Sequence, residues 1–351
     1  MRPIGPRRQR AVTSAFAFAF MLLAGCTAAG PSASPHATSP LPVTPAPSAT
    51  AAPTATPAPF PATVTDDEGN AVTLAAEPQK IVSLTPAATE ILYAVGAGPR
   101  VVAKVEDIAS YPPEASAVPV VATYKGVDVE KIVSLGADLV ISGGADFGQG
   151  DAVDQLRKAK IPVLVVKPTT TAGVVSDIRF IGQAAGDGPA ATQLADTMAA
   201  GFDAIRTATA GVAHPTVFYE TGNAPAIYGI ADGSVYAELI TLAGGTPVTT
   251  GSTTNYEMST EKLVAADPAL ILLGDAAYGV TADEVKARPG WSGLSAVKSG
   301  SIVPVDDLVI TRPGPRMLLG LVELVHAIHP ELTLPAGLPT PLPSLGTSPS
   351  P

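Results

Sequence analysis

The side chains that could bind a ligand in this 351-residue chain are chiefly aromatic residues and arginines on loops predicted to follow β-strands. In open α/β sheets such loops face the ligand cleft. Aromatic rings there hold a flat, apolar ligand with a large contact area and a small loss of conformational entropy. The candidate ligand-binding residues are Thr85, Pro86, Tyr111, Tyr124, Phe147, Tyr219, Tyr228, Tyr256 and Arg312.

Two arginines near the C-terminus, Arg312 and Arg316, have the chemistry to meet a carboxylate or phosphate of a ligand. For Arg316 a local cap or ion pair is the alternative. An anionic siderophore would need several basic groups in the cleft, and few basic residues fall on the predicted cleft loops. This favours a near-neutral ligand.

Other chemistries find little support in the sequence. A hydrolase needs a nucleophile elbow or a Ser/His/acid set, but no G-x-S-x-G occurs and no histidine lies on a predicted cleft loop. A binding protein for Zn or Mn ions needs clustered His, Asp and Glu ligands, which the sequence does not suggest. We therefore predict no catalytic residue, no metal site and no cofactor. A metal-ion binding protein remains the first alternative, and an exported hydrolase a less favoured one.

The charge balance is acidic, with a formal net charge of −10. Proteins that bind nucleic acids need clustered Lys and Arg to neutralise phosphates. We therefore expect no nucleic-acid partner.

A short pattern occurs twice, at residues 130–141 and 261–272. Each copy reads as a helical segment that turns at an aspartate, Asp138 or Asp267, into an apolar strand. The repetition indicates two similar α/β lobes.

One long helix is predicted between these copies, at residues 189–210. Pro189 suits the first helical turn, where its missing N–H is not needed. Leu194, Met198, Phe202 and Ile205 then form one apolar stripe. The predicted fold class is α/β, with two lobes that each have a central, mostly parallel sheet flanked by helices, joined by one long rigid interlobe helix. A ligand cleft is expected between the lobes.

Local patterns add detail to both lobes. A hairpin is expected over residues 63–74, and a buried strand followed by a helix over 81–96, capped by Thr85. Residues 123–126 read as a loop, 291–297 as a short helix and 315–328 as the last helix. Trp291 is predicted to lie in the core.

The N-terminus has the features of an export signal. Four arginines precede an apolar stretch at 11–23, which is too short to read as a membrane span. The sequence LAGC at 23–26 resembles the bacterial lipobox, which implies lipidation of Cys26; an ordinary cleaved signal with a chance cysteine is the alternative. The predicted organisation is a signal peptide (1–25), a Pro/Ala/Ser/Thr-rich spacer (26–62), an N-terminal lobe (63–170), a connecting helical segment (171–210), a C-terminal lobe (211–333) and a disordered tail (334–351).

Three stretches resemble the extracytoplasmic substrate-binding proteins of ABC importers for cobalamin and iron chelates, and most of all the cobalamin-binding branch. They are the strand–helix IVSLTPAATEIL at 81–92, the first-lobe segments at 124–132 and 137–141, and RPGPR at 312–316. The resemblance covers nearly all of residues 63–330. It departs from that branch at Tyr124, where the branch has Trp, and at Asn255, where the branch has an aromatic residue.

The resemblance implies a function and a set of partners. It implies a solute-binding protein that captures a cobalamin-like corrinoid or a ferric chelate (siderophore or haem) and delivers it to an ABC permease. It implies that Glu130 and Glu261, one on each lobe, dock to the permease; the alternative is that each only stabilises a helix N-terminus. Tyr124 is the strongest ligand-binding candidate. We expect an extracytoplasmic monomer held to the membrane by its lipid.

Overall fold

The computed structural model describes residues 60–340, which belong to one compact unit. The predictions for the signal peptide, for Cys26 and for most of the spacer lie outside these residues, as does the end of the predicted tail. Within 60–340, no helix combines the length and the apolar character needed to cross a membrane.

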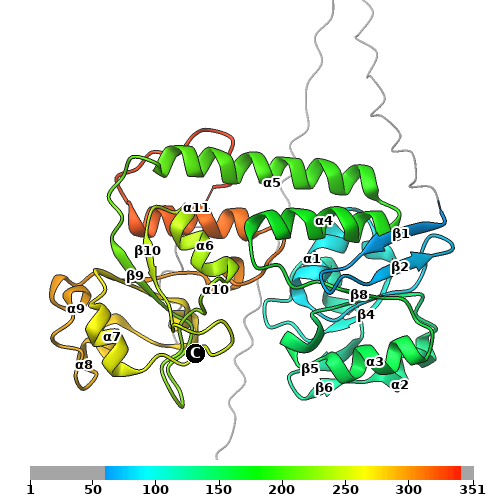
Figure 1. Cartoon of the computed structure of the whole chain (residues 1–351), viewed down its shortest axis with the longest axis horizontal. Coiled ribbons are helices and arrows are strands. Elements are labelled where there is room, and N and C mark those ends of the chain that lie inside the picture. Colours follow the sequence, from blue (N-terminus) through cyan, green and yellow to red (C-terminus); the bar gives the residue numbers. More distant parts are fainter. Residues whose placement is uncertain (1–59, 341–351) are drawn as a thin grey trace, which may run out of the picture. The chain divides into compact units, whose positions relative to one another are not determined.

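The N-terminal lobe is built on a six-stranded sheet (Figure 1). All its neighbouring strands are parallel except β6, which pairs antiparallel to β5. The strand order is β6 (Gly126–Val127), β5 (Val120–Thr123), β4 (Val101–Val105), β3 (Ile81–Ser83), β7 (Leu139–Ser142) and β8 (Val163–Val165). The helices of the lobe are α1 (Pro86–Ala94), α2 (Val129–Leu135) and α3 (Gly150–Lys158), and the lobe opens with the hairpin β1 (Ala62–Thr65) and β2 (Ala71–Leu74).

The C-terminal lobe contains a four-stranded, wholly parallel sheet. Its strand order is β10 (Thr246–Val248), β9 (Thr216–Glu220), β11 (Leu270–Leu273) and β12 (Ile302–Pro304). Its helices are α6 (Val235–Leu242), α7 (Thr260–Ala266), α8 (Ala282–Ala287), α9 (Ser295–Ser299), α10 (Asp307–Ile310) and α11 (Met317–Ile328).

Two long helices connect the lobes. α4 (Thr171–Ala185) and α5 (Gly188–Thr209) pack along each other, and α5 extends over both lobes (Figure 1). Their packing is close at Gly182, because an added Cβ would collide with the side chain of Ala191. The connection is thus a pair of helices, of which α5 is the predicted interlobe helix.

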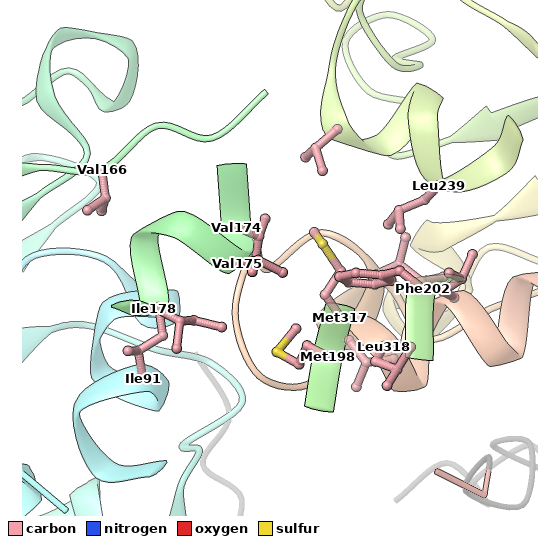
Figure 2. Close-up of a cluster of buried hydrophobic side chains, with 14 of the residues drawn as sticks. Ile91, Val166, Val174, Val175, Ile178, Met198, Phe202, Leu239, Met317 and Leu318 are labelled. Carbon is pink, nitrogen blue, oxygen red and sulfur yellow. The ribbon is translucent and has the colours of Figure 1, made fainter. Parts of the chain in front are cut away.

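One continuous apolar core underlies this connection. Figure 2 shows Val174, Val175 and Ile178 of α4 near Ile91 and Val166 of the N-terminal lobe. On α5, Met198 and Phe202 face Leu239, Met317 and Leu318 of the C-terminal lobe. The apolar stripe predicted from the sequence is therefore the surface on which α5 packs, with Met198, Phe202 and Ile205 almost fully buried.

The structure confirms the two-lobe α/β fold class and corrects details. Residues 123–126 form a tight antiparallel turn, with Thr123 paired to Gly126, where a loop was predicted. The helix predicted at 291–297 is wrong in its first half, because residues 291–294 form a turn around Gly293 and α9 starts at Ser295. Trp291 lies in the core, as predicted.

The packed part of the chain also exceeds the predicted limits. Phe60 precedes residue 63 and packs against the core. Leu334 and Leu338, placed in the tail by the sequence, do the same.

Candidate functional site

A cleft with a volume of about 770 Å³ lies between the two lobes. Residues from both lobes and from α4 line it, so neither lobe forms the site alone. Most of its lining segments follow the carboxyl ends of parallel strands, which is the position that open α/β sheets use for ligands.

A buried polar network positions the N-terminal wall. The Gln149 side chain donates a hydrogen bond to the Leu84 carbonyl (2.7 Å) and accepts one from the Ser142 hydroxyl (2.7 Å). It thereby ties the ends of β3 and β7 to the 3-10 helix η3 (Gly144–Phe147). Phe147 lines the cleft and is 52% exposed. An apolar ring exposed to this degree is free to contact a ligand.

Thr85 and Pro86 lie beside this wall at the start of α1. The Thr85 hydroxyl accepts the Ala88 N–H at 3.1 Å, which is the predicted helix cap. Both residues line the cleft. The Thr85 oxygen is thus already engaged with the helix, and Pro86 presents an apolar surface.

Three tyrosines form the aromatic part of the C-terminal wall: Tyr236 of α6, Tyr256 before α7, and Tyr278 at the end of the 3-10 helix η4 (Gly274–Tyr278). The hydroxyl of Tyr236 donates to the Thr311 carbonyl at 3.0 Å, which fixes its ring. Tyr256 and Tyr278 are 48% and 64% exposed. With Phe147 on the N-terminal wall and these tyrosines on the C-terminal wall, the cleft has aromatic rings on both sides.

The predicted ligand-binding residues fall into three groups. Five line the cleft: Thr85, Pro86, Phe147, Tyr256 and Arg312. Three lie outside its lining, namely Tyr111, Tyr124 and Tyr228, and for them contact with a ligand stays a prediction. Tyr124 is 90% exposed on the β5–β6 turn.

The prediction for Tyr219 is wrong. Its side chain is fully buried, and its hydroxyl donates to the Asp307 carboxylate at 2.6 Å. The residue lies within β9 instead of after it, so its ring belongs to the core.

A family described as periplasmic binding protein matches residues 81–307, which is more than half of the chain. The chain belongs to the periplasmic binding protein family. This periplasmic binding protein is therefore a solute-binding protein and not an enzyme.

Curated relatives and solved structures agree with this assignment. The chain is 34% identical to an uncharacterized ABC transporter substrate-binding lipoprotein, YvrC, of Bacillus subtilis (strain 168), over 78% of this chain and 87% of that protein. It is 29% identical to the vitamin B12-binding protein of Salmonella typhimurium, over 71% and 90% of the two chains. The structure of the periplasmic heme-binding protein RhuT from Roseiflexus sp. RS-1 in apo form has a TM-score of 0.63 and 28% identity, over 72% and 98%.

Two arginines of the periplasmic binding protein join its lobes by buried ion pairs. Arg312 donates to both oxygens of Asp107 at 2.9 and 2.5 Å, and Arg316 donates to both oxygens of Glu90 at 3.0 and 2.7 Å. The Arg316 guanidinium also lies 3.9 Å from the centre of the Tyr111 ring. We call these five residues the interlobe clasp.

The clasp changes the interpretation of its arginines. Burial raises the pKa of Asp107, but the hydrogen bonds and charge of Arg312 and the backbone hydrogen bonds of Ala109 and Tyr111 together outweigh it and lower that pKa. Burial raises the pKa of Glu90 despite its pairing with Arg316. Arg312 lines the cleft with its charge already matched by Asp107. Arg316 forms an ion pair with Glu90 of the other lobe, which is neither a ligand contact nor the local pair that the sequence suggested as its alternative.

Apart from Asp177, the remaining charged groups of the lining are also engaged. Lys167 lies 3.9 Å from a carboxylate oxygen of Asp146. Asp232 accepts the Thr249 hydroxyl, and Asp307 accepts those of Tyr219 and Thr311. Within residues 60–340, no group of three or more His, Cys, Asp or Glu side chains could hold a metal ion.

The predicted docking residues are not part of the cleft lining. Glu130 is exposed in the first turn of α2, and Glu261 is exposed in the first turn of α7. In Figure 1 these two helices lie low on their lobes, away from α5. A smaller hollow of about 410 Å³ adjoins Glu130 and is lined by further acids, Asp128 and Asp151.

Several residues of the site were missed in the sequence. Tyr278 follows β11 closely, so the rule of strand carboxyl ends could have found it. Tyr236 lies in the first turn of α6, and a helix position gives no sign in the sequence of facing a cleft. Glu90 and Asp107 are separated from their arginines by more than 200 residues, and no local pattern signals such pairs.

Proposed function

We propose that this protein is the extracytoplasmic substrate-binding component of an ABC importer and that it captures a cobalamin-like corrinoid between its lobes. The observation that carries this proposal is the interlobe cleft of about 770 Å³ with aromatic rings on both walls. That volume lies within the usual range for small-molecule sites. The names of the relatives, an ABC transporter substrate-binding lipoprotein and a vitamin B12-binding protein, support the same function.

The charges of the cleft favour a near-neutral ligand. Its two basic side chains, Lys167 and Arg312, each have a carboxylate partner. The carboxylates of a ferric siderophore, or the two propionates of haem, would lie near acidic side chains of the cleft. They would find no unpaired basic side chain in the cleft lining to balance their charge. A corrinoid carries neutral amides around its ring, and its faces suit Phe147, Tyr256 and Tyr278.

We further propose how the protein is held and where it docks. The lipobox resemblance supports lipidation of Cys26, and the spacer at 26–62 would hold the lobes off the membrane. Glu130 and Glu261 occupy equivalent helix starts on the two lobes, which supports docking to a permease that presents basic groups.

Isothermal titration of the purified protein tests the proposed ligand. Cyanocobalamin, haemin, a ferric siderophore and Zn²⁺ would be titrated separately at pH 7. We expect cyanocobalamin to bind at one site with a Kd below about 1 μM. Failure of cyanocobalamin to bind below roughly 100 μM would reject the corrinoid proposal, and saturable binding of Zn²⁺ alone would favour the metal-ion alternative.

A further inference from the structure

A buried aspartate, Asp177 of α4, forms part of the cleft wall without a counter-charge. It lines the cleft, yet its side chain is only 1% exposed. Its Oδ1 atom is closed to solvent and accepts no hydrogen bond from any N–H or hydroxyl of residues 60–340. A carboxylate buried in this way would carry a large desolvation penalty.

The group that meets Asp177 is another carboxyl, that of Asp67 in the β1–β2 turn. Two carboxyls can hydrogen-bond to each other only when one of them holds a proton. Asp67 is exposed and accepts the Lys167 backbone N–H at 2.6 Å, so it is the better site for the negative charge. Burial, together with the neighbouring Asp67, raises the pKa of Asp177 to about 9, so Asp177 is the protonated partner at pH 7.

The other charged groups nearby are matched elsewhere. Asp66 pairs with Arg157 at 3.2 Å, Lys167 lies near Asp146, and Glu90 of α1 is held in the interlobe clasp. On α6, Glu238 accepts the Thr171 N–H at the start of α4. On α5, Asp196 pairs with Arg179 in an exposed position. Among the described residues, none of the basic side chains in these contacts pairs with Asp177.

We propose that Asp177 is a specificity-determining ligand contact: it shares its proton with Asp67 and accepts an amide N–H of the bound ligand. The inference rests on the proposed function, because it needs a ligand in the cleft. It explains why an ionisable residue occupies a buried wall position where an apolar residue would avoid the desolvation penalty. A corrinoid offers amide N–H groups at its edge, whereas haem offers carboxylates, which the negative charge of Asp67 repels.

The test compares Asp177→Ala and Asp177→Asn with the natural protein by isothermal titration of cyanocobalamin and haemin at pH 7. Asp177→Ala should weaken cyanocobalamin binding roughly tenfold, the scale of one lost hydrogen bond. Asp177→Asn should recover most of that loss, because its amide can donate to Asp67 and its oxygen can still accept. Haemin affinity should not fall in either variant. The exposed Asp196→Ala on α5 is the matched control and should bind as the natural protein does.

The outcomes separate this inference from the proposed function. Equal cyanocobalamin affinity of Asp177→Ala and the natural protein would overturn the contact and leave the corrinoid proposal standing. Absence of cyanocobalamin binding to the natural protein would reject both. Infrared spectroscopy adds a readout that needs no ligand: the difference between the natural protein and Asp177→Asn at pH 7 should contain a protonated carboxyl band, and its absence would overturn the shared proton.

Discussion

At the scale of single residues, the two exposed tyrosines of the cleft carry the clearest expectation for binding. Tyr256 is 48% exposed and lines the cleft, so its ring can cover one face of a ligand. Tyr256→Ala should weaken cyanocobalamin binding about tenfold, because one aromatic contact contributes roughly 1 kcal/mol beyond its area. Tyr256→Phe keeps the ring and serves as the control in the same titration. A Tyr256→Ala variant with unchanged affinity would remove this residue from the site.

A second buried acid predicts how stability depends on pH. Asp275, at the start of η4, is 4% exposed, and neither of its oxygens accepts a hydrogen bond from an N–H or hydroxyl of the described part of the chain. Its neighbour Glu220 receives both guanidinium hydrogen bonds of Arg288, at 2.6 and 2.7 Å. Burial and the adjacent Glu220 raise the pKa of Asp275 to about 7.

The sign of this effect follows from proton linkage. Between its ordinary pKa of 3.8 and about 7, Asp275 holds a proton in the folded protein and loses it on unfolding. Its contribution to stability therefore falls as pH rises through this window. Asp275→Asn should remove that slope and raise the free energy of unfolding at pH 7.5 by on the order of 2 kcal/mol. Urea denaturation from pH 5 to 8 measures this, and parallel pH profiles for the two proteins would contradict it.

At the scale of elements, the sequence was most informative where a pattern is local. The cap of α1 by Thr85, the two helices that turn at Asp138 and Asp267, and the apolar stripe of α5 are each set by neighbouring residues. α3, α8, α10 and β10 were not predicted. α10 has four residues and β10 has three, so they depend on packing more than on their own sequence. α8 has six residues and begins with a capping box of Thr281 and Glu284, a local signal that could have predicted it.

The site was less predictable than the fold for the same reason. The rule of strand ends placed Phe147 and Pro86 at the cleft, and both line it, but the rule also placed the buried Tyr219 there. No sequence rule could reveal that Arg312 and Arg316 meet acids of the other lobe, because those acids are brought close only by the complete fold.

The interlobe clasp gives a prediction for these elements. Removing one member of a buried ion pair leaves an unmatched charge, which typically costs about 3–5 kcal/mol. Arg316→Met should therefore lower the free energy of unfolding strongly. The double variant Glu90→Gln/Arg316→Met should lower it by much less than the sum of the two single changes. Arg206→Ala, which breaks an exposed pair with Asp203, is the control and should change the free energy of unfolding by less than about 1 kcal/mol. Additive effects at Glu90 and Arg316 in urea denaturation would show that the pair is not coupled.

At the scale of the whole molecule, capture and delivery are assigned to different surfaces. Ligand affinity should depend on the cleft. Delivery should depend on the tips of the lobes, meaning the first turns of α2 and α7, which carry Glu130 and Glu261. Reversing both charges with Glu130→Lys and Glu261→Lys should leave cyanocobalamin affinity unchanged and reduce uptake by cells. Replacing the exposed Asp154 of α3 by Lys is a control for added positive charge. Normal uptake by the double variant would reject the docking role.

The central claim is that one ligand is held by both lobes at once, and hydrogen–deuterium exchange with and without saturating cyanocobalamin tests it most directly. We predict slower exchange in the segments that line the cleft from each side, around residues 85–91 and 166–169 in one lobe and 232–236 and 253–256 in the other. The tips at α2 and α7 should exchange at the same rate in both states. Slower exchange confined to a single lobe, or to the tips, would contradict the claim.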